Sequence, residues 1–359
     1  MSKFTRRHFV QMGLGVPLVA AGVGGFARSS AAQLGKELRV ATWGGSWKDS
    51  IDANIGKAIA DKGVKIDYTL GNPTDNLARL IAAQRQGQVP FDVMEGFPHI
   101  TGEMAEAGLI QALDYDKMPN AKATPEWARF KHEIVSLYTQ DGIIYNTEKF
   151  KEAGIPVPTT YADLANPKLA GKVAFPDISN AQHWNGIVGM AYESGGSEAK
   201  LDGAVEMLAK IKPAYYFSAS TELANRFGSG DVWAAAWHAG WAVRLRRSNV
   251  PLSVAYTPFG QKKGALWPVP VYIISKTPNQ AAAEAFVDNL MSPAGQLSHG
   301  KQTGSVPVDS AARKAIGEDA ISAELLMLGD KEMENAHQID WSKLNVKAWQ
   351  ETWARQVKR

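Results

Sequence analysis

The chain has 359 residues, enough for two domains of ordinary size. Hydrophobic residues make up 45% and charged residues 21%, a composition that excludes a wholly disordered or fibrous chain. The absence of cysteine excludes disulfides, thiolate nucleophiles and cysteine-ligated metal centres. With 39 basic and 36 acidic residues, the charge is too balanced to indicate a nucleic-acid-binding protein.

The first 32 residues have the three-part pattern of an export signal. Lys3, Arg6 and Arg7 begin it, a glycine-rich apolar run follows at 10–26, and residues 30–32 (Ser-Ala-Ala) fit a small-x-small cleavage site. Residues 5–10 resemble the twin-arginine signal that exports folded proteins. The apolar run is shorter than the ~20 residues that span a bilayer, although a retained anchor is the alternative. We expect a twin-arginine-type signal peptide at 1–32 and a periplasmic mature protein.

The next part of the chain alternates between strand and helix patterns. Hydrophobic spacing predicts strands at 37–43, 65–70 and 91–94, and helices at 48–62, 76–86 and 101–107. This β-α-β-α-β order predicts a parallel sheet with helices on both faces. Ligands of such sheets bind at the carboxyl ends of the strands.

A second α/β unit is expected after residues 142–146. We predict helices at 181–192, 199–210 and 280–290, strands at 232–237, 253–256 and 269–275, and a polar tail after the last helix. A Gly/Lys-rich link is expected at 260–264. Two α/β units joined by extended crossovers leave a cleft, which is a common place for a small ligand.

Several stretches together resemble one family. They are Val40-Ala41-Thr42-Trp43-Gly44-Gly45, Phe91-Asp92-Val93, Gly108-Leu109-Ile110, Gly142-Ile143-Ile144-Tyr145-Asn146-Thr147, Tyr161-Ala162-Asp163-Leu164 with the Pro167 to Val173 segment, and the Ala285 to Pro293 segment. In order and spacing, over about residues 37 to 310, they resemble the extracellular solute-binding proteins of ABC importers. That group contains the spermidine/putrescine-binding, ferric-iron-binding and thiamine-binding proteins.

The resemblance implies an α/β, two-lobe periplasmic-binding-protein fold of type II. Each lobe is expected to be a mostly parallel sheet flanked by helices, with the ligand cleft between the lobes. Lobe 1 is expected at 33–140 plus about 268–302, and lobe 2 at 141–267 plus about 303–359, including the C-terminal tail. The implied partners are a small-molecule solute and a permease in the inner membrane. A monomer is expected, without cofactor, metal, nucleic acid or catalysis.

The resemblance also implies cleft positions for aromatic side chains. Trp43, Trp47, Trp184, Trp237 and Trp267 fall where the family lines its cleft. An indole face attracts an ammonium group by ~0.5–2 kcal/mol, which suits an amine ligand. The alternative is core packing, because tryptophan is buried on average.

Polar and charged candidates follow the same strands. Phe97 and His99 come after the third strand and are expected to line the cleft. Polyamine binders of the family place one carboxylate where Asp177 stands and another two residues past a cleft tryptophan, where this chain has Val269 after Trp267. Glu95 or Glu222 is expected to supply the missing second carboxylate. For Glu222 the alternative role is that of a solvated acid in the first turn of a helix.

A hydroxyl-rich segment precedes a helix near residue 222. Ser218, Ser220 and Thr221 are expected either to bind an anionic group with the helix amides or to cap the helix. Arg226 and Arg244 are expected to pair with an acidic ligand group or to be exposed helix charges. One carboxylate, an aromatic box and hydroxyl donors would suit a γ-amino acid better than a polyamine.

Two other classes stay open. A ferric-iron, thiamine or organophosphonate ligand would fit the same fold, with Tyr215-Tyr216 as an adjacent tyrosine pair for iron. A secreted hydrolase is the alternative from another class, although the chain has neither a G-x-S-x-G nor an H-E-x-x-H motif.

Overall fold

The computed structural model describes residues 34–357, which form one compact unit. The predicted signal peptide, residues 1–32, therefore lies outside the described residues. In residues 34–357 we find no helix with the length and apolar character that crossing a membrane requires.

One mixed sheet of ten strands organises the unit. Its main path has the order β2-β1-β3-β11-β4-β7-β5-β6, and β8 and β12 pair with β4 beside that path. The strands are β1 (Glu37–Thr42), β2 (Lys65–Leu70), β3 (Val93–Glu95), β4 (Ile134–Asn146), β5 (Val173–Pro176), β6 (Tyr215–Phe217), β7 (Ala234–His238), β8 (Leu252–Ala255), β11 (Ala265–Ile273) and β12 (Val306–Pro307). A separate hairpin joins β9 (Pro258–Phe259) to β10 (Lys262–Lys263).

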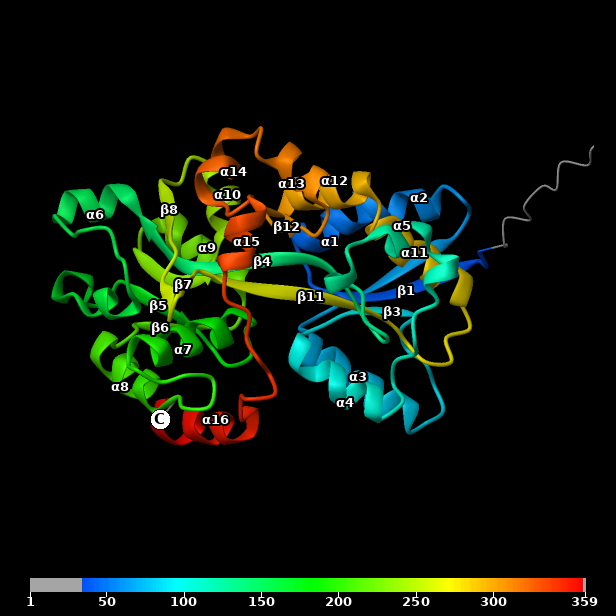
Figure 1. Cartoon of the computed structure of the whole chain (residues 1–359), viewed down its shortest axis with the longest axis horizontal. Helices are drawn as coiled ribbons and strands as arrows, with labels where there is room; N and C mark the ends of the chain where they lie inside the picture. Colours follow the sequence, from blue (N-terminus) through cyan, green and yellow to red (C-terminus); the bar gives the residue numbers. More distant parts are fainter. Residues whose placement is uncertain (1–33, 358–359) are drawn as a thin grey trace, which may run out of the picture. The chain divides into compact units, whose positions relative to one another are not determined.

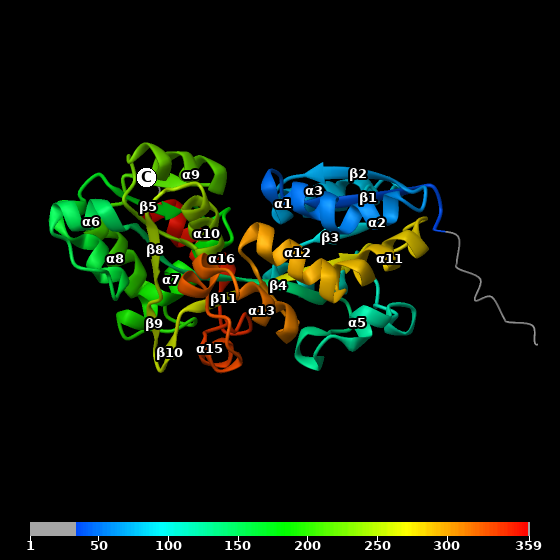
Figure 2. The same cartoon turned by 90° about the horizontal axis from the view of Figure 1, so that it is seen from above.

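The two ends of the sheet are parallel and its middle is antiparallel. Strand β1 pairs in parallel with β2 and β3, and β5 pairs in parallel with β6 and β7. We call the β1–β3 end the first lobe and the β5–β7 end the second lobe. Strands β4 and β11 are antiparallel to each other and lie between the two lobes (Figures 1 and 2). The predicted α/β fold with parallel strands in each lobe is confirmed.

Helices cover both faces of each lobe. Figure 1 shows α1 and α2 on one side of β1 and β3, with α3 and α4 on the other, and it shows α9 and α10 opposite α7 and α8 across β5 and β7. The helices are α1 (Ser46–Ile51), α2 (Lys57–Ala60), α3 (Pro73–Gln84), α4 (Thr101–Glu106), α5 (Pro119–Ala123), α6 (Thr147–Ala153), α7 (Gln182–Glu193), α8 (Asp202–Ile211), α9 (Ser220–Ser229), α10 (Ala239–Arg247), α11 (Gln280–Leu290), α12 (Pro293–Thr303), α13 (Ser310–Ile316), α14 (Ala320–Leu325), α15 (Asp330–Asn335) and α16 (Val346–Thr352).

Local sequence explains several element boundaries. Asn146 accepts a hydrogen bond from the Lys149 amide at the start of α6, and Ser292 accepts one from the Gly295 amide at the start of α12. Strand β4 is rich in β-branched and aromatic residues, and all of its 13 residues are buried. Continuous burial on both faces is what a strand at the centre of a covered sheet requires.

Strand β11 begins at Ala265, four residues before the predicted start at Val269. Pro268 and Pro270 lack the amide proton of a strand residue, so their local sequence indicates a late start. Pairing with β4 overrides that preference, and the register shifts between Val269 and Pro270 to accommodate the prolines.

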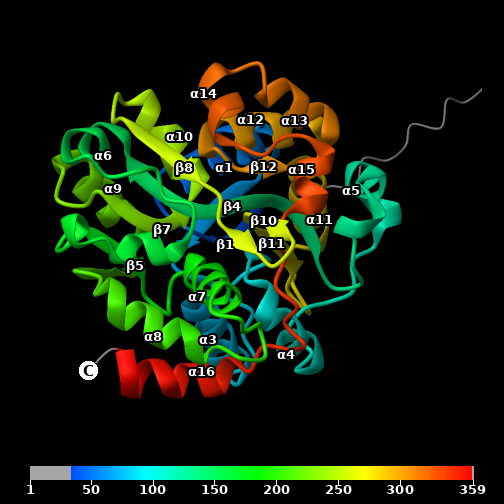
Figure 3. The same ribbon diagram turned by 60° about the vertical axis from the view of Figure 1, so that its left-hand side comes forward.

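The segment after α11 is a run of helices, so the expected polar tail is wrong. Apolar side chains recur in it at helical spacing, as Ala312 with Ile316 and Trp349 with Trp353, and all four are buried. The lobe boundaries that the resemblance implies stay a prediction, although α14 packs on α10 of the second lobe and α16 lies beside α8 (Figure 3).

A buried histidine holds the C-terminal helix α16. The Trp349 indole Nε1–H donates to Nε2 of His183, 2.7 Å away. His183 Nδ1 lies 3.0 Å from the Pro176 carbonyl oxygen, so the ring donates there through Nδ1–H. Burial lowers the pKa of His183 to about 4, which keeps the ring neutral and able to accept the indole proton.

Replacing Trp349 by Phe tests this contact. The change keeps an aromatic ring but leaves Nε2 of the fully buried His183 without its donor. We expect unfolding to become easier by about 1–3 kcal/mol in urea titrations. Trp127→Phe is the control, because Trp127 is 50% exposed, and equal stability of both variants would contradict the role of His183.

Candidate ligand-binding site

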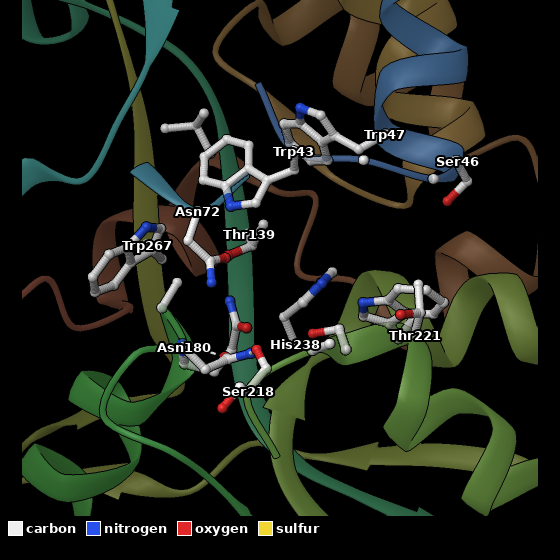
Figure 4. A pocket seen from close by; sticks show the side chains of 18 of the residues that line it. Trp43, Ser46, Trp47, Asn72, Thr139, Asn180, Ser218, Thr221, His238 and Trp267 are labelled. Carbon is white, nitrogen blue, oxygen red and sulfur yellow. Dashed lines mark hydrogen bonds between the residues drawn. The ribbon is translucent and has the colours of Figure 1, made fainter. Parts of the chain in front are cut away.

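A cavity of about 420 Å³ lies where the two lobes meet at β4 and β11. Thr139 of β4 and Trp267 of β11, which are partners in the strand register, belong to its lining. Trp43 and Asn72 line it from the first lobe, and Ser218 from the second (Figure 4). The cavity is therefore built by both lobes around the strands that join them.

Helix N-termini gather around this cavity. The residues just before α3, α9 and α10, which are Asn72, Ala219 and His238, all line it. None of these three residues makes a side-chain cap hydrogen bond to its helix. The geometry follows from the fold, since each helix starts where a strand ends. First-turn amides and the positive end of the helix dipole favour a negatively charged group.

Four indoles form apolar parts of the wall. They belong to Trp43, Trp47, Trp241 and Trp267. The Trp43 and Trp47 rings meet edge to face with centroids 5.4 Å apart. Trp267 is 2% exposed, and its Nε1–H has no hydrogen-bond partner among the described residues.

Two more polar groups of the lining lack partners within residues 34–357. They are the Thr139 hydroxyl and Nδ1 of His238, and both side chains are more than nine-tenths buried. Burial lowers the pKa of His238 well below its ordinary value, so its ring is neutral at pH 7. Together with Trp267 Nε1, these groups suit a ligand that has hydrogen-bonding atoms.

Among residues 34–357, two charged side chains line the cavity. Asp75 stands in the first turn of α3 and is exposed, whereas Arg244 of α10 is partly buried. The guanidinium lies 3.6 Å from the Trp241 ring centroid, and its Nη1 donates to Ser46 Oγ of the first lobe at 2.7 Å. Desolvation lowers the pKa of Arg244 to about 9, so the group stays charged at neutral pH.

The structure brings four of the nine predicted site residues into the lining: Trp43, Trp47, Ser220 and Trp267. The other five, Glu95, Phe97, His99, Asp177 and Trp237, lie outside it. Ser218 and Thr221 also line the cavity, and neither is a side-chain cap of α9.

Glu95 lies directly behind the wall. Its carboxylate accepts hydrogen bonds from the Thr42 hydroxyl and from Trp47 Nε1, the latter at 2.9 Å. Complete burial raises the pKa of Glu95 to about 7. The side chain thus orients the Trp47 indole.

Phe97 and His99 form the next aromatic layer. Phe97 contacts Trp43 and Trp267 with ring centroids 6.0 and 5.4 Å apart, and His99 stacks on Phe97 at 5.5 Å. Burial lowers the pKa of His99 to about 4. Trp341 of the C-terminal segment closes this layer against His99 and Trp267, at 5.0 and 5.5 Å.

Trp237 lies in the hydrophobic core, as the core-packing alternative expects. It is 1% exposed and stacks between Phe227 and Trp241, with centroid distances of 5.7 and 5.2 Å. Its Nε1 donates to Ser220 Oγ at 3.0 Å. The reason is register, because the indole points into the layer beneath α9 and α10 while the next residue, His238, reaches the cavity.

Acidic candidates of the second lobe also have local roles. Asp177 accepts hydrogen bonds from the amide and the hydroxyl of Ser179 in the turn after β5. Glu222 faces Arg226 at 3.5 Å on the exposed side of α9.

Trp184, an aromatic candidate for the cleft, is buried against His99 and Trp341.

Sequence reasoning missed Asn72, Asn180, His238, Trp241 and Trp341, and for Arg244 it gave both a ligand contact and an exposed helix charge. Asn72 and Asn180 follow strands β2 and β5, and His238 ends strand β7, so the rule that parallel strands present ligands at their carboxyl ends could have found them. Trp341 has no such signal, because it reaches the site from a segment remote in sequence.

The fold has two lobes with a cavity between them, which is the arrangement expected of a protein that binds a small ligand. Residues 55–325 match the bacterial extracellular solute-binding protein family. The chain is 24% identical over 287 residues to spermidine/putrescine-binding periplasmic protein 1 of Haemophilus influenzae. The alignment covers 76% of this chain and 78% of that protein.

Two solved structures share the fold. An ABC transporter substrate-binding protein of Bradyrhizobium japonicum matches with a TM-score of 0.72 and 18% identity, covering 90% of this chain and 100% of that one. A GABA receptor matches with a TM-score of 0.70 and 20% identity, covering 89% and 96%. The chain belongs to the bacterial extracellular solute-binding protein family, and its fold is the two-lobe fold of periplasmic binding proteins.

Glu95→Gln tests the buried carboxyl behind Trp47. The folded-state pKa of about 7 lies above the unfolded value, so ionisation costs stability as pH rises from about 4.5 to 7. Gln keeps acceptors for Thr42 and Trp47 and removes that cost. We expect the variant's free energy of unfolding, relative to that of the wild type, to be higher at pH 8 than at pH 4.5 by about 3 kcal/mol. Urea unfolding of both proteins at the two pH values measures this difference. A pH-independent difference would be contrary to this assignment, and the exposed Glu106→Gln is the control.

Proposed function

We propose that this protein is the substrate-binding component of an ABC importer and captures a small amine-containing solute in the periplasm. The observation that carries the proposal is the cavity of about 420 Å³ between the lobes, walled by four tryptophans. Its size suits a small organic molecule, and indole faces attract ammonium groups. A curated relative is named as a spermidine/putrescine-binding protein, and a protein of the same fold is named as a GABA receptor.

The proposed mechanism is closure of the lobes over the solute. Groups from both lobes line the cavity, and Ser46 and Arg244 already touch across it. A solute that contacts both walls stabilises the closed form, because it binds that form more tightly than the open one. The closed monomer then delivers the unaltered solute to a permease in the inner membrane. Export by the predicted signal peptide belongs to the same proposal.

Ferric iron fits the geometry less well. Tyr215 stacks under Arg226 and Tyr216 contacts Trp353, and neither tyrosine lines the cavity. Within residues 34–357, no group of three or more His, Asp or Glu side chains could hold a metal ion. Iron therefore stays a weaker candidate than an organic solute.

A ligand screen tests the proposed function. Thermal-shift assays with diamines, polyamines, ω-amino acids, thiamine, organophosphonates and ferric citrate should identify a stabilising solute. A ligand at about 100 times its dissociation constant stabilises the fold by ~2.7 kcal/mol. Small-angle scattering should then show contraction, and mass spectrometry should recover the solute unchanged. Contraction with none of these solutes, or recovery of a reaction product, would overturn the proposal.

Trp43 and Trp237 should differ sharply when replaced by alanine. Trp43→Ala removes part of the cavity wall, so we expect weaker binding of the screened solute and a folded protein. Trp237→Ala empties a core site and should cost about 3–5 kcal/mol of stability. Calorimetric titration and urea unfolding measure the two effects, with the exposed Trp127→Ala as control. Unchanged affinity in Trp43→Ala would argue against its contact with the solute.

A further inference from the structure

Arg244 is held in place by contacts that leave part of its guanidinium free. Its Nε donates to the Gly240 carbonyl oxygen at 3.2 Å, and Nη1 donates to Ser46 Oγ at 2.7 Å. The group also stacks on the Trp241 ring at 3.6 Å. Of the five N–H donors of an arginine, the described residues thus occupy two. The orientation is set by the protein while the remaining donors are available at the cavity.

The charge of Arg244 has no counter-ion within residues 34–357. On the same helix, Arg246 pairs with Glu324 and Arg247 pairs with Asp319, each at 2.9 Å. Arg244 alone of these three lines the cavity, and no acidic side chain forms an ion pair with it in that part of the chain. A desolvated guanidinium without a partner is costly, so a bound anion would relieve a penalty that the ligand-free protein carries.

Neighbouring groups favour an anion at the same place. Helix α9 begins at Ser220 and α10 at Ala239, and neither helix has a side-chain cap. His238, the residue just before α10, has a buried Nδ1 without a hydrogen-bond partner among the described residues. The first-turn amides of these helices are donors, and a carboxylate offers acceptors only.

The opposite side of the cavity suits a cation. Figure 4 shows Trp43, Asn72 and Trp267 on one side, with Ser46 and Thr221 on the other. Asp75, in the first turn of the helix that Asn72 precedes, offsets the positive end of that helix and is the acidic residue that residues 34–357 place in the lining. An ammonium group can therefore meet an indole face and a carboxylate on that side.

From this polarity, and resting on the proposed function, we infer that the solute carries a single carboxylate opposite its amine and that Arg244 binds that carboxylate. An ω-amino acid has this arrangement. One arginine balances one negative charge, so a doubly charged phosphonate would leave charge uncompensated. A diamine would place an ammonium against the guanidinium, and like charges at close range repel.

Calorimetric titration with matched probes tests the inference. We compare 4-aminobutyrate with putrescine, and 5-aminopentanoate with cadaverine. In each pair one end is an amine in both molecules, and the other end is a carboxylate in the amino acid and a second amine in the diamine. We expect the wild-type protein to bind an amino acid at least about 10-fold more tightly than its matched diamine. Arg244→Gln should weaken amino-acid binding by about 10- to 100-fold, and Arg244→Lys should restore part of it.

The control variant is Arg226→Gln, which removes the same charge from an exposed position of α9 outside the lining. It should bind like the wild type. The ligand-free Arg244→Gln protein should melt at the wild-type temperature or above, because an uncompensated charge has been removed. A purely structural arginine would instead lower that temperature.

The outcomes separate this inference from the proposed function. Two results would refute the inference that the solute carries a carboxylate but would leave an amine-binding protein. One is that the wild type prefers a diamine and Arg244→Gln still binds it. The other is tighter binding of 2-aminoethylphosphonate than of 4-aminobutyrate. Failure of all these amines to bind refutes the proposed function and the inference with it. Loss of amino-acid binding in Arg244→Gln but not in Arg226→Gln supports both the proposed function and the inference.

Discussion

The antiparallel pairing of β4 with β11 is the constraint on which the rest of the structure depends. Both strands lie between the lobes, and β4 is buried along its full length. Their hydrogen bonds join two parallel sheets that would otherwise be separate units. The same pairing brings Thr139 beside Trp267, so the strands that connect the lobes also line the cavity. In the proposed mechanism, a hinge and a binding site at one place let a ligand influence closure directly.

The chemistry of the cavity follows from the direction of the strands. Every β-α unit that faces the cleft presents the carboxyl end of a strand and the amino end of a helix. Such an edge is rich in amide donors and poor in acidic side chains, which suits an acceptor group more than a second ammonium. Trp43 and Trp267 on the other side present indole faces, which in general attract cations. Residues 34–357 thus give the cavity lining two charged side chains, Asp75 and Arg244.

Behind the cavity wall lies a supporting layer that carries much of the remaining chemistry. Glu95 orients Trp47, Phe97 packs between Trp43 and Trp267, and Trp341 supports Trp267 from the C-terminal segment. Glu95 and Phe97 stand at the carboxyl end of β3, as the wall residues stand at the ends of other strands, so local sequence does not distinguish the two layers. Alternation along a strand decides which side chain reaches the cavity, as His238 and Trp237 illustrate.

Hydrophobic periodicity indicated the α/β class and the parallel pairing of the first three strands, because it marks each strand and helix within a short segment and a β-α-β-α-β order favours parallel strands. Local sequence likewise indicated Trp43 and Ser220, which stand where a strand ends or a helix begins. Only the tertiary structure decided that β11 starts at Ala265, that Arg244 has no counter-ion within residues 34–357, and that Trp341 packs on Trp267. Each of these depends on residues more than 70 positions away in the sequence. Strand β11 pairs with β4, and Trp341 packs on Trp267. The acidic residues near α10 pair with Arg246 and Arg247 and not with Arg244. No local pattern encodes which distant side chains a fold brings together, since burial and charge pairing belong to the packed chain as a whole.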